Sequence, residues 1–219
     1  MIKEKINELL TQLPTQVRLI AVSKTKPVAA ILEAYEAGQR DFGENKVQEL
    51  VEKQAQLPKD IRWHLIGHLQ TNKVKYAASF VHLIHAVDSL KLLQEIDKQA
   101  KKNKRMQKVL LQFYIAQEET KFGLELNEAK TLLDSSEYQA LQNIEICGVM
   151  GMASFTEDEV QVRKEFGELH AIFNELKASY FAEQASFSEI SMGMSGDYQL
   201  AIEAGSTMIR VGSSIFGGR

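Results

Sequence analysis

The stretch from Val17 to Pro27 reads VRLIAVSKTKP, an apolar run that ends in polar residues and a proline. Runs rich in β-branched and aliphatic residues are typical of buried strands, and a proline shortly afterwards favours a turn toward a helix. The stretch therefore predicts a strand that passes into a helix, with Lys24 at the carboxyl end of the strand. Most lysines at such positions simply reach water, so the rest of the chain must decide whether this amine has a chemical role.

Seven further runs rich in Val, Ile and Leu follow, and they alternate with segments of helical spacing. Strands are expected at residues 17–23, 41–43, 62–66, 81–86, 108–113, 144–149, 187–192 and 207–211. Helices are expected at 28–37, 44–56, 71–78, 89–102, 126–135, 157–178 and 198–204, and the spacing of residues 1–13 adds an N-terminal helix. With no compositional break along the chain, this alternation predicts a single α/β domain over residues 1–219, a (β/α)8 TIM barrel. A doubly wound parallel sheet is the alternative.

Composition narrows the classes of partner. The chain has 219 residues, a net charge of -3 and a pI near 6.0, which argues against a nucleic-acid partner. Its single cysteine, Cys147, excludes an internal disulfide and a multi-cysteine metal site and favours a reduced, cytoplasmic setting. No apolar stretch approaches the roughly twenty residues of a membrane span, so no membrane partner is expected.

Two loops rich in glycine and hydroxyl side chains follow the seventh and eighth predicted strands, at residues 192–197 and 212–218. Barrel active sites form at the carboxyl ends of the strands, and phosphate groups often bind in the loops after strands seven and eight. Small residues at a helix start expose backbone N–H groups toward an anion, and Ser195 adds a hydroxyl. We therefore expect a phosphate-bearing ligand there, with Asp197 as a helix N-cap rather than a catalytic acid.

Arg210 shares the strand parity of Met208 and Gly212, one step before the second loop. A guanidinium at the barrel rim would hold a ligand acceptor and lower the pKa of a nearby lysine, although a structural ion pair with a barrel carboxylate is an equal alternative. An amine must be neutral to attack a carbonyl, and an ordinary lysine pKa near 10.4 leaves little neutral amine at neutral pH. A cation beside a phosphate corner therefore suggests that Lys24 is a Schiff-base lysine.

The remaining polar loops point to binding rather than to metal chemistry. Asn45, at a predicted helix start, can donate to a ligand oxygen or merely cap the helix. His64 and His68 share one strand parity but lack a third ligand nearby, so no metal is expected. The sequence has no nucleophile elbow, P-loop or dinucleotide fingerprint. Methionines near the ends of strands six and seven are expected mainly to pack the barrel mouth, among them Met192.

Seven ordered motifs span nearly the whole chain: residues 21–27, 42–49, 63–73, 121–123, 148–150, 191–197 and 210–217. On these motifs the chain resembles the pyridoxal phosphate homeostasis proteins, also called the YggS-like or proline synthetase co-transcribed family. The resemblance implies a fold type III barrel similar to the N-terminal domain of bacterial alanine racemase, with pyridoxal 5′-phosphate as a Schiff base on Lys24. It also implies a binding role for six further residues: Ser195, Gly212 and Ser213 at the phosphate, Arg210 facing the pyridine nitrogen, and Asn45 and Met192 bordering the ring.

Two functions of different kinds follow from this resemblance. The first is vitamin B6 homeostasis, in which the protein buffers pyridoxal phosphate or delivers it to recipient enzymes as a monomer, without robust turnover and with no established catalytic residue. The alternative is a pyridoxal-phosphate-dependent amino-acid racemase, which needs a second acid/base opposite the lysine. In alanine racemases another domain supplies that base, whereas this sequence ends at Arg219, and nothing places His64, His68 or Tyr198 opposite Lys24. The phosphate loops alone would also allow a sugar-phosphate isomerase or aldolase.

Overall fold

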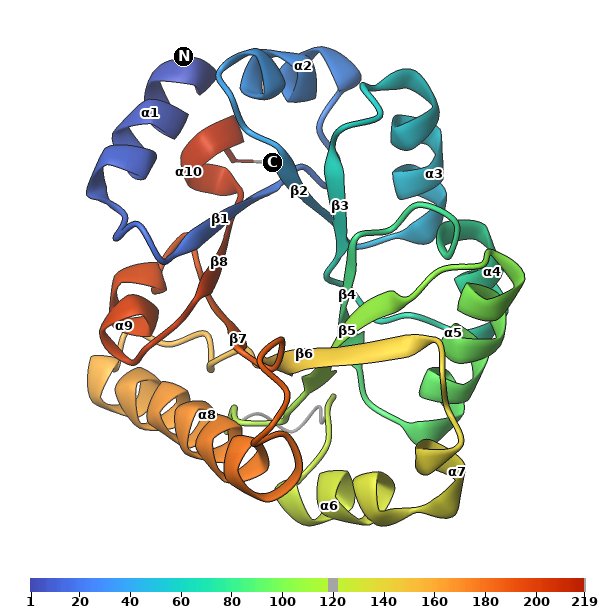
Figure 1. Cartoon of the computed structure of the whole chain (residues 1–219). Helices are drawn as coiled ribbons and strands as arrows, with labels where there is room; N and C mark the ends of the chain where they lie inside the picture. Colours follow the sequence, from blue (N-terminus) through green and yellow to red (C-terminus); the bar gives the residue numbers. More distant parts are fainter. Residues whose placement is uncertain (118–121, 219) are drawn as a thin grey trace.

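Eight parallel strands close into a barrel in chain order, with helices around the outside (Figure 1). The computed structural model describes residues 1–117 and 122–218. The strands are β1 (Arg18–Val22), β2 (Asp41–Glu44), β3 (Arg62–Leu65), β4 (Leu83–Val87), β5 (Gln107–Gln112), β6 (Ile144–Met150), β7 (Glu189–Met194) and β8 (Met208–Val211). All eight predicted strands are confirmed within a few residues, and the pairing of β1 with β8 rules out the doubly wound sheet.

The helices are α1 (Ile2–Gln12), α2 (Val28–Glu36), α3 (Val47–Gln56), α4 (Val74–Ala77), α5 (Leu90–Lys102), α6 (Leu126–Asp134), α7 (Ser136–Gln139), α8 (Glu159–Tyr180), α9 (Tyr198–Glu203) and α10 (Ser213–Phe216), with a 3-10 turn η1 at Thr71–Lys73. The predicted N-terminal helix is α1, and α10 lies beside it (Figure 1). In the ranges that the structure describes, no helix combines the length and the apolar character needed to cross a membrane.

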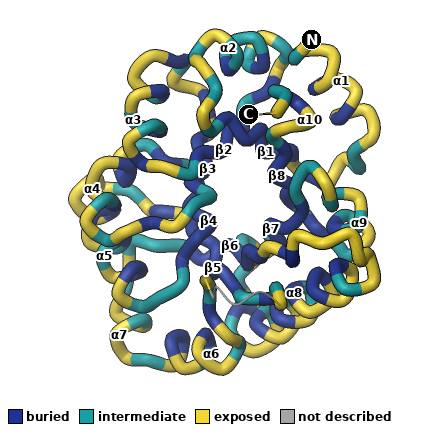
Figure 2. The backbone as a smooth tube through the Cα atoms, turned by 180° about the vertical axis from the view of Figure 1, so that it is seen from behind, coloured by how far each residue is buried: buried dark blue, intermediate teal, exposed yellow. Residues whose placement is uncertain are grey.

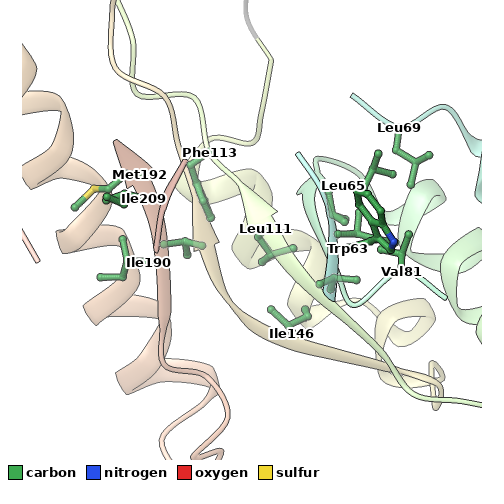
Figure 3. Packing of buried hydrophobic residues seen from close by; sticks show 14 of the residues in the cluster. Trp63, Leu65, Leu69, Val81, Leu111, Phe113, Ile146, Ile190, Met192 and Ile209 are labelled. Carbon is green, nitrogen blue, oxygen red and sulfur yellow. The ribbon is translucent and has the colours of Figure 1, made fainter. Parts of the chain in front are cut away.

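Apolar side chains pack in two places, between the barrel wall and the helices and inside the barrel. The strands form a buried ring, while the outer surfaces of the helices are exposed (Figure 2). Trp63, Phe113 and Ile190 belong to the larger cluster outside the ring (Figure 3), and a smaller cluster around Ile20 and Cys147 fills part of its interior. Burial raises the pKa of the Cys147 thiol to about 12, so this thiol is protonated at neutral pH.

Glycine allows the closest approach of two strands in the wall. Gly148 in β6 has a φ of 153°, and a Cβ atom there would lie 1.8 Å from the carbonyl oxygen of Glu189 in β7. The neighbouring β5–β6 ladder shifts register between Val109 and Leu110. Only a residue without a side chain fits this position, so Gly148 fixes the spacing of β6 and β7.

The structure departs from the predicted boundaries mainly around the barrel mouth. β2 includes Glu44, where the sequence pattern predicts a helix, and α3 begins only at Val47. β7 continues to Met194 through Gly193, whose φ of 94° a period-two pattern does not reveal. The predicted loop after β8 contains the short helix α10. Each of these changes lies at the carboxyl ends of the strands.

Candidate functional site

A cavity of about 420 Å³ opens at the carboxyl ends of the strands, where its walls come from β1, β2, β3, β6, β7 and β8 and the segments that follow them. It brings together six of the seven residues predicted for the site: Lys24, Asn45, Ser195, Arg210, Gly212 and Ser213. A volume of this size lies within the range of small-molecule pockets. The sequence therefore identifies a set of residues that the fold gathers from positions up to almost two hundred residues apart.

Met192 is the predicted residue that the structure does not bring to the cavity. Its side chain is fully buried in the cluster between β7 and the helices, where it lies near Ile209 (Figure 3). Met194 lines the cavity instead, next to Arg210 in the ladder with β8. The positive φ of Gly193 and a register shift after Ser191 reverse the alternation of side chains at this point.

Lys24 follows β1 directly and is half-buried at the cavity wall. The residues on either side of it are held by one buried amine and two carboxylates. Lys53 Nζ donates to the carbonyl oxygen of Ser23 at 2.7 Å and to Oε1 of Glu44 at 2.7 Å. It also donates to Oε1 of Glu49 at 2.6 Å, and the same oxygen accepts the backbone N–H of Thr25 at 2.5 Å. This Lys53 clamp fixes the backbone that carries Lys24.

The carboxylates of the Lys53 clamp differ in burial. Glu44 is fully buried, and its Oε1 accepts hydrogen bonds from Lys53 and the Ser23 hydroxyl, while its Oε2 has no hydrogen-bond partner among the described residues. Burial raises the pKa of Glu44 despite those bonds. For Glu49, burial works in the same direction but is outweighed by hydrogen bonds from Lys53 and Thr25, which lower its pKa. The charge on Glu44 thus depends on Lys53.

Arg210 enters the cavity from β8 and is 4% exposed. Its Nη1 donates to Ser191 Oγ at 2.6 Å and its Nη2 to the carbonyl oxygen of Gly151 at 2.9 Å. Burial lowers the pKa of Arg210 to about 10, and the charge of Asp197 partly opposes that shift. The guanidinium stays cationic at neutral pH and bonds to neutral oxygens, so the alternative of a direct ion pair with a barrel carboxylate does not hold among the described contacts.

The two predicted phosphate loops meet at one corner of the cavity. Ser195 Oγ accepts the backbone N–H of Gly212 at 3.1 Å, which leaves its own proton available to a ligand. Gly212 precedes α10, whose first N–H groups have no intrahelical acceptor. Asp197 precedes α9 as predicted, but its carboxylate accepts the N–H of Met194 at 2.5 Å rather than capping the helix. Burial raises the pKa of Asp197, while the hydrogen bond from Met194 and the charge of Arg210 act to lower it.

Sequence reasoning missed the contact that ties the loop after β1 to the end of the chain. Lys26 Nζ donates to the carbonyl oxygens of Phe216, Gly217 and Gly218 at 3.3, 3.0 and 2.9 Å. These residues follow β8, and both glycines line the cavity. Three carbonyl oxygens around one ammonium group satisfy all of its donors. Nothing in the sequence of residues 24–26 indicated that Lys26 would bind the carbonyl oxygens near the end of the chain.

The loop after β6 supplies a further wall that the sequence indicated only through its methionines. Met152, Ser154 and Phe155 line the cavity, and the Phe155 side chain is 99% exposed. Lys121 of the predicted 121–123 motif lies outside the described residues. His68 lies at the rim, 3.7 Å from Asp88, whereas His64 is fully buried inside the barrel. No group of three metal-ligating side chains occurs among the described residues.

Comparisons with known proteins agree with this geometry. The family model described as alanine racemase, N-terminal domain, matches residues 1–219. A pyridoxal phosphate homeostasis protein of Synechocystis sp. is 40% identical over 217 residues, covering 97% of this chain and 96% of its own. The solved structure of PipY of Synechococcus elongatus with pyridoxal phosphate bound is 40% identical, with a TM-score of 0.89 over 99% of this chain and 100% of its own.

A more distant structure supports the fold alone. The alanine racemase of Clostridium difficile is 14% identical with a TM-score of 0.80, and the match covers 100% of this chain and 60% of that one. The barrel predicted from the sequence is thus similar in fold to part of this enzyme. The family model, which matches residues 1–219, and the relatives at 40% identity show that the chain belongs to the alanine racemase N-terminal domain family.

Proposed function

We propose that this protein binds pyridoxal 5′-phosphate and acts in its homeostasis, as a buffer or as a carrier to recipient enzymes. The observation that carries the proposal is one cavity that holds an amine, a buried guanidinium and a corner of hydroxyl and N–H donors. Pyridoxal phosphate has an aldehyde, a ring nitrogen and a phosphate, so each of the three features has a counterpart on this cofactor. The names of the close relatives and the PipY complex support the same assignment.

Each group of the cofactor has an assigned partner in this proposal. Lys24 joins its aldehyde as a Schiff base, Arg210 faces its pyridine nitrogen, and Asn45 borders the ring. Ser195, Gly212 and Ser213 hold its phosphate through hydroxyl and backbone N–H groups. We assign the other ring contact to Met194 rather than Met192, because only Met194 lines the cavity.

A cofactor bound in this way supplies an electron sink for amino-acid chemistry, and its strength depends on the pyridine nitrogen. Arg210 remains protonated and cannot readily give a proton to that nitrogen. A carboxylate at this position would favour the protonated ring, which is the stronger sink. The arginine therefore leaves the ring nitrogen largely unprotonated and the bound cofactor a weaker electron sink, whichever of the two functions it serves.

We extend the proposal to the setting of the protein. The whole chain forms one cofactor-binding domain that acts as a monomer in the cytoplasm and hands the cofactor to other enzymes. The lysine, the arginine and the phosphate corner all come from one chain, so the site needs no second copy. The single, buried thiol suits a reducing compartment.

Borohydride reduction with peptide mapping tests the central assignment. Protein loaded with pyridoxal phosphate should become yellow, and after reduction the cofactor mass should appear on the peptide that contains Lys24. Lys24→Ala should abolish the adduct, while Lys46→Ala, a neighbouring exposed lysine outside the cavity lining, should retain it. Protein that cannot be loaded, or an adduct spread over surface lysines, would reject the proposal.

The racemase alternative requires a separate measurement. Incubation of the loaded protein with amino acids in deuterated water should produce no sustained exchange of the α-proton across a broad panel. Exchange that proceeds for many turnovers and disappears in Lys24→Ala would establish the enzyme instead. Because cofactor loading is scored separately, this result would change the function without changing the binding site.

A further inference from the structure

Five buried polar side chains form a continuous row of hydrogen bonds across the inside of the barrel. Arg210 Nη1 donates to Ser191 Oγ at 2.6 Å, and that oxygen lies 2.9 Å from Nδ1 of His85. Nε2 of His85 lies 2.9 Å from Nδ1 of His64, whose Nε2 lies 2.9 Å from Oδ1 of Asp41. None of the five is more than 5% exposed. The row joins β8 and β7 to β4, β3 and β2 through the barrel interior.

The two ends of the row lie at opposite mouths of the barrel. Arg210 lines the cofactor cavity, whereas Asp41 lines a second cavity of about 410 Å³ near the amino ends of the strands. There Asp41 accepts two hydrogen bonds from Arg62, at 2.8 and 2.5 Å. Burial acts to raise the pKa of Asp41, but the bonds from Arg62 and His64 outweigh it and hold that pKa far below its usual range. One end of the row is thus a fixed anion and the other a fixed cation.

Fixed charges at both ends leave a single arrangement of protons along the row. The Asp41 carboxylate accepts only, so Nε2 of His64 must donate to it. Burial lowers the pKa of both histidines, so both are neutral at neutral pH. The charge of Asp41 acts to raise the pKa of His64, but burial outweighs it. Nδ1 of His64 then accepts from Nε2 of His85. Nδ1 of His85 in turn accepts the Ser191 hydroxyl proton, which turns a lone pair of that oxygen toward Arg210.

This arrangement determines how Arg210 is held. Its guanidinium has five N–H donors in a rigid plane, and the acceptors on Ser191 and Gly151 bind Nη1 and Nη2. The remaining donors are left for a ligand in the cavity that the side chain lines. If the Ser191 hydroxyl rotated to donate elsewhere, the cation would lose an acceptor. The two histidines prevent that rotation because His85 always offers a lone pair to the hydroxyl proton.

We propose that Ser191, His85 and His64 are positioning residues that orient Arg210 toward the ring nitrogen of the bound cofactor, through one ordered row of hydrogen bonds anchored on Asp41. The role of the row in cofactor binding rests on the proposed function. The order of its protons does not, because it follows from contacts within the chain. The two parts therefore need different measurements.

The order of the protons is tested in the cofactor-free wild-type protein, so no variant has to fold. Nitrogen-15 NMR of protein labelled at its five histidines distinguishes a protonated ring nitrogen from an unprotonated one. We expect His64 and His85 both to be neutral and protonated at Nε2 at pH 7. Protonation of either residue at Nδ1, alone or together with Nε2, would overturn the proposed order.

The role toward the cofactor is tested with Ser191→Ala, which removes the oxygen between His85 and Arg210. Ser206→Ala is the matched control, because Ser206 is a buried serine between β7 and β8 that donates to backbone carbonyls outside the row. With pyridoxal phosphate labelled at the ring nitrogen, the nitrogen signal should shift in Ser191→Ala and stay at the wild-type position in Ser206→Ala. Binding should weaken about tenfold in Ser191→Ala, which equals about 1.4 kcal/mol.

The outcomes separate the two proposals. A wild-type signal and affinity in Ser191→Ala, or the same change in both variants, would overturn the positioning role while cofactor binding stands. If borohydride places no cofactor on Lys24, the proposed function and the positioning role fail together, and the histidine protonation measured without cofactor still reports on the row itself.

Discussion

Replacing Lys53 with methionine tests how the chain holds the segment around Lys24. The substitution preserves the apolar stem but removes the ammonium group that bonds to Ser23, Glu44 and Glu49. Glu49 is partly exposed, so water can replace its lost bond, whereas the Glu44 side chain is 0% exposed. Removing one partner of a buried ion pair costs about 3–5 kcal/mol because a charge is left uncompensated. We expect a loss in this range, a large share of the roughly 5–15 kcal/mol that stabilises a typical domain.

The loss of stability in Lys53→Met should depend on pH, and the direction of this dependence follows from the pKa of Glu44. Burial already raises the pKa of Glu44, and without Lys53 this pKa rises further in the folded chain. A carboxyl whose folded-state pKa exceeds its unfolded value contributes stability below the unfolded pKa and loses it as pH rises through the folded pKa. The deficit of Lys53→Met relative to wild type should therefore shrink from pH 8 to pH 5, because Glu44 becomes protonated in the folded variant.

Urea unfolding followed by the fluorescence of Trp63, the chain's one tryptophan and a buried residue, measures both effects. Lys130→Met is the matched control, since Lys130 pairs with Glu175 at the surface and exposed pairs contribute little. The double variant Lys53→Met/Glu44→Gln should recover much of the loss, because it leaves no buried charge. The reasoning would be refuted by a single variant as stable as the Lys130 control, or by a double variant no more stable than Lys53→Met.

Three further perturbations have defined outcomes. The unfolding free energy of the cofactor-free protein should fall between pH 6.5 and 5.5 in urea titrations. His82, whose folded-state pKa is lowered to about 4, contributes about 1 kcal/mol of this fall, and His64 and His85 add to it because their lowered folded-state pKa values also let the unfolded chain take up protons first. A flat profile would contradict the burial of these histidines as neutral groups. Gly148→Ala should abolish soluble folded protein. Gly167→Ala, on an open helix surface, should instead raise the unfolding free energy by about 0.5–1 kcal/mol. Comparable melting temperatures for the two variants would contradict the role of Gly148 in the spacing of β6 and β7. Arg210→Glu should shift the absorbance of the bound cofactor toward the protonated-pyridine form, and an unchanged spectrum across pH would count against the contact.

The barrel and most of the site were predictable because they depend on local patterns and on one topological rule. Apolar runs of strand length alternate regularly with helical spacing, and eight such runs leave few ways to bury both faces of the strands. In a parallel barrel all carboxyl ends of the strands meet at one mouth. Lys24 and Arg210 could therefore be placed together from sequence, although 186 positions separate them.

The parts that escaped prediction depend on backbone geometry or on contacts between distant strands. Strand alternation places Met192 and Met194 on the same face, but the positive φ of Gly193 separates them, so that Met192 packs in the outer core and Met194 lines the cavity. Lys53 lies four residues after Glu49 on a helix, a spacing typical of exposed ion pairs, yet packing of α3 against β2 buries it. Sequence position alone could not distinguish this lysine from a surface lysine.

The buried histidines show a second limit of prediction from the sequence. The sequence pattern indicates that His64 is satisfied rather than metal-bound, and the structure supplies its partners, Asp41 on β2 and His85 on β4. The row continues from His85 to Ser191 on β7 and Arg210 on β8, more than a hundred residues farther along the chain, so its order can be derived only once the barrel closes. Strand parity predicts that a side chain faces inward, but not which inward-facing group it meets.

The titratable groups described around the cavity already have structural bonds, and this favours a protein that holds a cofactor over one that turns over substrate. Apart from Lys24, these groups are Lys26, Asp197 and Arg210. Lys26 binds three carbonyl oxygens, Asp197 accepts a backbone N–H, and Arg210 ends an ordered row. A racemase needs a second group that gives and takes a proton opposite the lysine, and each of these three already takes part in hydrogen bonds within the chain. The same bonds hold these side chains of the cavity lining in place, which suits the proposed storage of a reactive aldehyde on Lys24.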